Sequence, residues 1–176
     1  SGGAILNGSI NGSADGTGIV NITSGEVLAY LADGVGTNNT LSQINVADDS
    51  SVEFRSDLGA NDINFSGRLM LNKFGGTEIN GNLTGSGAGN LSLNNAPSTV
   101  SQNLTLASGN SLSVIITNST TAGSITAVGA ASVDANITLR LTISDRIERG
   151  SSFTIVSGGV GSIINKIEDE NIRIND

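Results

Sequence analysis

The strongest constraint on this chain is a short motif of Asn, an aliphatic residue and Ser or Thr that returns at a nearly constant spacing. The motif and its variants are Asn21-Ile22-Thr23, Asn39-Thr40-Leu41, Asn61-Asp62-Ile63, Asn82-Leu83-Thr84 and Asn103-Leu104-Thr105. These runs stand about 18 to 22 residues apart, which is the length of one coil in a solenoid. The spacing therefore predicts a stack of coils in a parallel β-helix.

Apolar and polar residues alternate with a period of two, as in half-buried strands, and no stretch has a convincing helical period. The apolar positions are Ile44 and Val46, Val52 and Phe54, Ile63 and Phe65, Leu69 and Leu71, Leu91 and Leu93, Leu104 and Leu106, and Leu112, Val114 and Ile116. Gly-rich and Asn-rich segments separate these runs and supply the sharp corners between strands. Pro97 lies between two runs and is interpreted as a loop residue.

Equivalent residues of successive coils are expected to stack in parallel ladders. We expect one lane from Ile63, Leu83 and Leu104 and a second from Leu71, Leu91 and Leu112. Asn at matching positions can also stack and share side-chain hydrogen bonds along the axis. The alternative is that Asn recurs by chance in an Asn-rich chain.

After about residue 122 the period loosens and the strands become richer in Ile and Leu. We therefore predict two parts, β-helix coils over residues 1–122 and a C-terminal β cap over residues 123–176. A cap is expected because the last coil of a solenoid otherwise exposes an apolar cross-section and an unpaired edge. The predicted folding core of this cap is Ile137, Leu139, Leu141, Ile143, Phe153 and Ile155.

The residue types that are missing exclude several chemistries. The chain has no His and no Cys, so Ser-His-Asp and Cys-His catalysis and zinc sites built on His or Cys cannot form within it. We predict a protein that is not an enzyme and that holds no metal or cofactor. The net charge of −8, with only 8 Lys and Arg, argues against nucleic acid as a partner, and no apolar run is long enough to span a membrane.

One charged group is the candidate contact surface. Alternation from Val52 to Asp57 places Glu53, Arg55 and Asp57 together on an outward face, opposite Val52 and Phe54. This patch suits contact with a sugar or a protein. The simpler interpretation is a solvated face whose charges pair with one another.

The absence of Cys suits a protein that crosses a periplasm unfolded, and the alternative is a cytosolic chain that happens to lack Cys. The sequence starts at Ser1-Gly2-Gly3 without a signal peptide, so we expect a piece of a larger protein.

The C-terminal third resembles a known family. The run Ser132-Val133-Asp134-Ala135-Asn136-Ile137-Thr138-Leu139-Arg140-Leu141, followed by Gly150-Ser151-Ser152-Phe153-Thr154-Ile155-Val156, is similar to the C-terminal passenger region of bacterial autotransporters. In that family such a strand is followed by a Gly, two small polar residues and a strand that begins with an aromatic residue. The Asn-rich and Ile-rich character is also similar to surface-cell-antigen autotransporters of rickettsial type.

The resemblance implies a right-handed parallel β-helix on the extracellular side of an outer membrane, carried by a C-terminal β-barrel translocator. It implies that the cap corresponds to the autochaperone segment that promotes passenger folding, and that the partner is a host-cell surface protein or glycan. An adhesin or stalk is therefore expected. The alternatives are a carbohydrate-active β-helix, such as a tailspike, glycosidase or lyase fragment, and a purely structural solenoid of a surface layer or filament.

Overall fold

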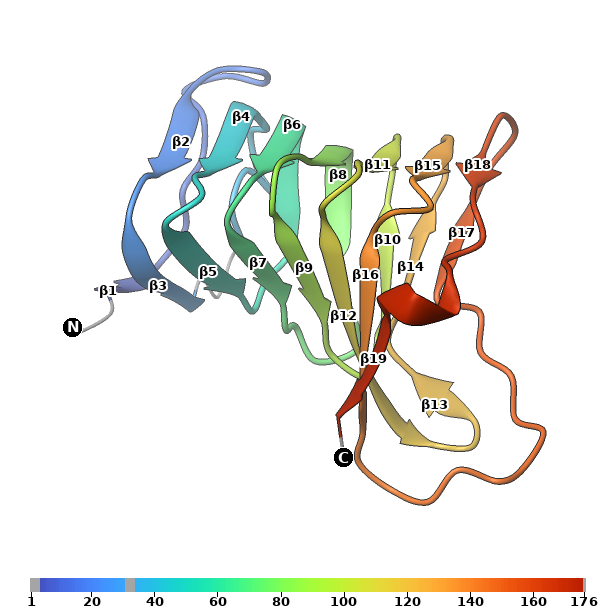
Figure 1. Cartoon of the computed structure of the whole chain (residues 1–176). Coiled ribbons are helices and arrows are strands. Elements are labelled where there is room, and N and C mark those ends of the chain that lie inside the picture. The colour runs from blue at the N-terminus through green and yellow to red at the C-terminus, as the bar shows by residue number, and fades with distance from the viewer. Residues whose placement is uncertain (1–3, 31–33, 176) are drawn as a thin grey trace.

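The computed structural model of the chain is an all-β protein made of two sheets in which nearly all strands run parallel (Figure 1). The structure describes residues 4–30 and 34–175, without the side chains of residues 4–7 and 26–30. The one helical segment in these ranges is the short 3-10 turn η1 (Asp169–Asn171). Within the same ranges, no helix has the length and apolar character needed to cross a bilayer. The all-β, parallel architecture predicted from the sequence is confirmed.

The first sheet contains nine strands, and all but one of them pair in parallel. In spatial order they are β1 (Ala4–Asn7), β3 (Gly25–Tyr30), β5 (Ser50–Phe54), β7 (Arg68–Leu71), β9 (Asn90–Leu93), β12 (Ser111–Asn118), β16 (Thr138–Ile143) and β19 (Ile172–Asn175), while β13 (Thr121–Ala122) pairs antiparallel with β12.

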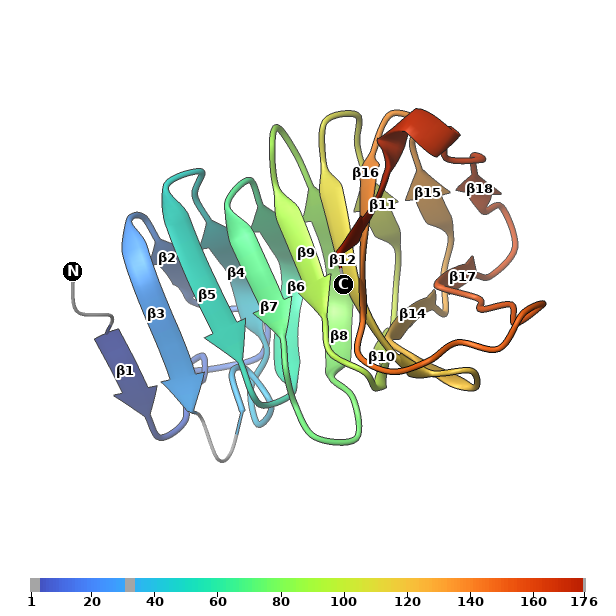
Figure 2. The same cartoon turned by 60° about the horizontal axis from the view of Figure 1, so that its bottom comes forward.

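The second sheet contains ten strands, all parallel to their neighbours. They are β2 (Ile19–Ile22), β4 (Leu41–Val46), β6 (Leu58–Phe65), β8 (Glu78–Gly85), β10 (Pro97–Val100), β11 (Leu104–Leu106), β14 (Ser124–Ala127), β15 (Ala131–Val133), β17 (Val156–Gly158) and β18 (Ile163–Ile164). The chain passes from one sheet to the other and back, so each strand pairs with the equivalent strand of the next passage. We call one such passage a rung, and Figure 2 shows the rungs lying side by side.

The second sheet bends in the middle of each rung. β6 and β8 pair with each other in two segments, with a shift of register between Gly59 and Asp62. Beyond β8 the two segments become separate strands, because the first part of β8 pairs with β10 and the last part with β11. The bend requires glycine: Gly81 has a φ of 142°, and a Cβ there would lie 1.6 Å from the Ala60 carbonyl oxygen.

The core lies between the sheets and consists of aliphatic ladders that run from rung to rung. Ile63, Leu83 and Leu104 are neighbours in successive rungs and are fully buried, as the sequence predicted. All the alternating apolar positions named above for residues 44–116 are buried as well. Burial of each large aliphatic side chain contributes roughly 1.5 to 3 kcal/mol, so stability accumulates rung by rung.

The second predicted lane has the wrong register. Leu91 and Leu112 do stack, but the neighbour of Leu91 in the preceding rung is Leu69. Leu71 instead pairs with Leu93, which in turn pairs with Val114. A shift of two residues keeps every side chain on the same face of a strand, so apolar spacing alone cannot distinguish the two registers. The lengths of the corners between strands decide between them.

Asn side chains form two separate ladders instead of one column. Asn45 Nδ2 donates to Asn21 Oδ1 at 2.8 Å, and Asn64 Nδ2 donates to Asn45 Oδ1 at 3.2 Å. A second ladder joins Asn103 Nδ2 to Asn82 Oδ1 at 3.2 Å. Stacking of Asn amides is confirmed, but among the motif residues only Asn82 and Asn103 stack on each other, and the partners of Asn21 are Asn45 and Asn64 from outside the motif. Asn39 instead donates to the Gly12 carbonyl, and Asn61 takes part only through its backbone carbonyl, which accepts from Asn82.

Two local predictions are wrong. Pro97 is the first residue of β10 and not a loop residue; this position suits Pro, because its missing N–H costs least at the start of a strand. The predicted strand from Phe153 to Val156 begins only at Val156, where β17 starts. Ile155 nevertheless joins the sheet through its carbonyl oxygen, which accepts from Ile125 N at 2.8 Å.

The C-terminal part continues both sheets. β14, β15 and β16 pair in parallel with β10, β11 and β12, and the paired positions are 27 and then 31 to 33 residues apart, against 17 to 25 earlier in the chain. The predicted loosening of the period is therefore present. Among the predicted cap-core residues Ile137 is fully buried, and the remainder, which are Leu139, Leu141, Ile143, Phe153 and Ile155, are partly buried. The boundary at residue 122 and the folding role of this part remain predictions.

Candidate functional site

The predicted contact patch lies where the chain leaves β5 and turns into β6. Glu53 is an outward residue of β5, because its neighbours Val52 and Phe54 are buried. Arg55 follows the end of β5, and Asp57 directly precedes β6. The predicted outward alternation of these three charged residues is present, since Ser56 between Arg55 and Asp57 is buried.

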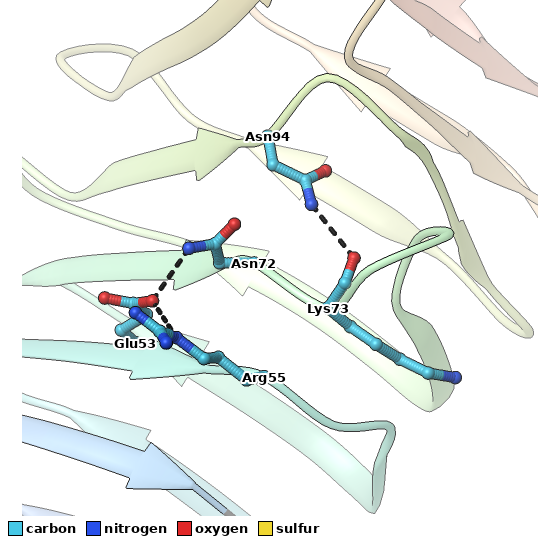
Figure 3. Close-up of polar contacts among 5 residues, drawn as sticks. All are labelled: Glu53, Arg55, Asn72, Lys73 and Asn94. Atoms are coloured by element: carbon cyan, nitrogen blue, oxygen red, sulfur yellow. Dashed lines mark hydrogen bonds and ion pairs between the residues drawn. The ribbon is translucent and has the colours of Figure 1, made fainter.

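Glu53 and Arg55 form an ion pair that the next rung reinforces (Figure 3). Arg55 Nε lies 2.5 Å from Glu53 Oε1, and Asn72 Nδ2, from the residue just after β7, donates to the same oxygen at 2.7 Å. The Glu53 side chain is only 13% exposed and that of Arg55 is 38% exposed. One carboxylate oxygen is thus held by two donors from two rungs.

The surroundings of Glu53 act on its pKa in opposite directions. Partial burial is the largest influence and raises the pKa, because it removes water from the charged form. The pKa is lowered by the hydrogen bonds from Arg55 and Asn72 and by the positive charges of Arg55 and Arg68. Together these interactions outweigh the effect of burial, so the pKa of Glu53 lies below its ordinary value. Glu53 is therefore a charged acceptor at neutral pH and is poorly suited to act as a general acid.

Asp57 belongs to a different cluster. Its Oδ2 lies 2.5 Å from Lys73 Nζ, and its Oδ1 accepts from the backbone N of Glu78 at 2.8 Å. Asp57 therefore ties the start of β6 to both ends of the loop between β7 and β8. Asn94 Nδ2, from the following rung, donates to the Lys73 carbonyl at 2.9 Å and extends this link (Figure 3).

The structure thus divides the predicted patch into two clusters, Glu53 with Arg55 and Asp57 with Lys73. Sequence reasoning missed Asn72, Lys73 and Glu78, because they reach the patch only through the pairing of β5 with β7 and of β6 with β8. The repeat spacing of about 20 residues is the signal that points to them. Both ion pairs are solvent-accessible, and each is expected to contribute about 0 to 1 kcal/mol.

A surface groove includes Asp57 and runs across five successive rungs, from Thr37 to Val128, along the outer side of the bend in the second sheet. Its volume is about 510 Å³. We call it the bend groove, and its polar lining residues are Thr37, Asp57, Glu78, Asn80, Thr99 and Ser101. Gly36 and Gly59 line it and let the backbones of two rungs approach closely, since a Cβ on Gly36 would lie 1.8 Å from the Gly59 carbonyl oxygen.

The polar groups of the bend groove differ in how they are engaged. Ser101 Oγ donates to Asn80 Oδ1 at 3.1 Å and accepts from Gly81 N at 2.9 Å. The carboxylate of Glu78 and the hydroxyl of Thr99 have no hydrogen-bond or ion-pair partner in the part of the chain that the structure describes. The groove therefore offers both fixed and unengaged polar groups.

Residues 4–30 and 34–175 contain no cluster of three or more Asp, Glu, His or Cys that could hold a metal ion. Among the described residues that line the bend groove, Asp57 and Glu78 are the only carboxylates.

Comparison with known proteins identifies no relative. No protein family model, no curated protein and no solved structure matches this chain significantly.

Proposed function

We propose that this chain is a surface-exposed passenger segment of a bacterial autotransporter, folded as a right-handed parallel β-helix, with an adhesin or stalk role. The observation that carries the proposal is the continuous parallel stack, in which aliphatic ladders such as Ile63, Leu83 and Leu104 share one core. The resemblance of residues 132–156 to the autotransporter passenger region gives the stack its cellular setting. The right hand agrees with the general preference of parallel strand connections.

Geometry supports the stalk role. Rungs of parallel strands lie about 4.8 Å apart, so each added rung moves a terminal binding region farther from the membrane. The polar outward ladders, such as Asn21, Asn45 and Asn64, keep the long faces solvated. A protein of this kind needs no catalytic group to perform its task.

Secretion through a barrel without ATP requires folding outside the cell to be favourable step by step. Residues 123–176 supply a template in this proposal, because β16 carries the inward Leu139 and Leu141 and pairs with β12 over six residue pairs. A rung that forms next to an existing rung avoids the cost of a new nucleus. The C-terminal part thus promotes the folding of the remaining passenger.

A display experiment tests the proposal. The chain is fused upstream of a heterologous outer-membrane β-barrel translocator in a bacterium with two membranes, and surface exposure is followed by antibody labelling of intact cells and by added protease. We expect a labelled, protease-resistant chain at the cell surface. Retention in the periplasm, with the same translocator exporting a known passenger, would contradict the proposal.

A matched variant separates folding from export. Leu139→Asp with Leu141→Asp places two carboxylates at inward positions of β16, whereas Arg140→Asp with Thr142→Asp places two carboxylates at outward positions of the same strand and lowers the net charge by one unit more. The inward variant should lose protease-resistant surface material, and the outward variant should retain most of it. Equal losses from both variants would remove the folding role of this segment.

A further inference from the structure

We propose that the bend groove binds an uncharged polysaccharide strand laid along the stacking direction, with Glu78 and Thr99 as the principal hydrogen-bonding groups. This proposal supplies a ligand class for the adhesin role and in that sense rests on the proposed function. It is tested on the purified chain in solution, whereas display is tested on cells, so each can fail while the other holds.

The shape of the groove selects an elongated ligand. The lining residues come from five successive rungs, from Thr37 in one to Val128 in the last. Four rung steps of about 4.8 Å give a length of roughly 19 Å, which suits several linked sugars and exceeds what a single small metabolite needs. Gly36 and Gly59 are lining residues, and as glycines they place no side chain between their backbone and a ligand.

The chemistry of the lining fits sugar hydroxyls. Glu78 offers carboxylate acceptors, Thr99 a hydroxyl that both donates and accepts, and Asn80 an amide; all three side chains are exposed. Neighbouring hydroxyl groups of a pyranose can donate to a carboxylate and accept from an amide or hydroxyl at once. Glu78 and Thr99 are neighbours in the pairing of β8 with β10, so they can act on one sugar.

An exposed aromatic residue, Phe74, precedes the groove residue Glu78 by four positions in the sequence. Phe74 is fully exposed, in the short loop that Asp57 anchors through Lys73 on one side and the Glu78 backbone on the other. Gly75 and Gly76 follow it with φ of 84° and 102°. An aromatic face presented in this way can stack on the apolar face of a sugar ring, which would give the unpaired side chain a role.

Charge distinguishes neutral glycans from acidic ones. Lys73 neutralises Asp57, and Glu78 leaves the groove with an excess negative charge within a chain of net charge −8. An acidic polysaccharide would be repelled. An extended cationic peptide is the competing ligand that the same charge permits, and the test includes it.

The test is a titration of the isotope-labelled 176-residue chain followed by amide NMR shifts. The probes are short soluble oligomers of β-1,4-glucose, α-1,4-glucose and β-1,4-N-acetylglucosamine, a heparin oligosaccharide and tetralysine. We expect at least one neutral oligomer to shift amides of residues 57–59, 78–80 and 99–101 with saturation. No saturable shift with any neutral oligomer at millimolar concentration would overturn the proposal, and so would groove shifts with heparin or tetralysine alone.

Variants link binding to the named groups. Glu78→Gln with Thr99→Val should weaken binding of the active oligomer about tenfold or more, since a hydrogen bond to a charged group is lost. Phe74→Ala should weaken binding several-fold. The matched control is Glu148→Gln with Thr105→Val, which makes the same chemical changes outside the groove and should leave affinity unchanged. Equal weakening by the test pair and the control pair would overturn the assignment of the site.

Discussion

The contact between Phe65 and Gly85 provides a sharp test of the stacked core. Phe65 ends β6, Gly85 ends β8, and the two residues are direct neighbours in successive rungs. Phe65 is 1% exposed, and a Cβ built on Gly85 would lie 2.6 Å from Phe65 Cζ and 2.4 Å from Asn110 Oδ1. The aromatic ring therefore requires a glycine in the rung that follows it.

Gly85→Ala should destabilise the chain by about 2 to 4 kcal/mol. Overpacking a filled core costs about 1 to 3 kcal/mol. The variant also displaces Asn110, a fully buried residue whose Oδ1 accepts from Ala107 N at 2.9 Å, and a lost buried hydrogen bond adds about 1 kcal/mol. Gly85 does not have a positive φ, so backbone strain contributes nothing to this cost.

A double-mutant cycle isolates the steric part. Phe65→Leu alone should cost about 1 kcal/mol through a small cavity, and the pair Phe65→Leu with Gly85→Ala should be at least about 1 kcal/mol more stable than the sum of the single changes predicts. Rescue is incomplete, because the clash with Asn110 persists. The free energies come from urea unfolding at equilibrium, compared only where the variants share one m-value.

The result that would refute this reasoning is additivity. If the two changes combine within about 0.3 to 0.5 kcal/mol, Phe65 and Gly85 do not contact each other, and the register of β6 with β8 is wrong. Gly75→Ala is the control, since its Cβ would meet nothing within 4 Å and only its φ of 84° is strained. It should cost about 1 kcal/mol and show no coupling to Phe65→Leu.

Three further predictions concern single features. Thr77→Val should leave stability unchanged or raise it by up to about 1 kcal/mol in urea unfolding, because the Thr77 hydroxyl is buried without a hydrogen-bond partner; a loss above that size would mean the hydroxyl is satisfied. The lowered pKa of Glu53 stabilises the fold above the unfolded pKa of about 4.5, and this stability is lost as pH falls through the folded pKa. The unfolding free energy should therefore drop less between about pH 6 and pH 3 in Glu53→Gln than in the unchanged chain, by a difference below about 1 kcal/mol. An equal drop in both proteins would contradict the lowered pKa. Deletion of residues 123–176 should impair refolding from denaturant far more than deletion of residues 1–54, and equal losses would remove the folding role of the C-terminal part.

The alternation of apolar residues predicted the inward positions well, because a strand has only two faces and a buried face admits few polar residues. Leu83 and Leu104 illustrate this, since their burial and their mutual stacking both followed from the repeat. Leu71 illustrates the limit. Its neighbour Leu69 satisfies the same pattern, and only the corner lengths select which of them meets Leu91.

The candidate site was predictable only in part. Glu53 and Arg55 were placed together because they are two residues apart on one strand face, and they do form an ion pair. The bend groove could not be predicted, because its residues are separated by about 20 positions each and become neighbours only through the bend at Gly59 and Gly81.

The sequence by itself determined the strand periodicity, the aliphatic character of the core and the absence of His and Cys chemistry, because these depend on residue types and on spacing along one chain. The tertiary structure alone decided the register between rungs, the division of the charged patch into two clusters and the presence of a groove. These features depend on which residues of different rungs become neighbours, and the geometry of the glycine corners sets that choice.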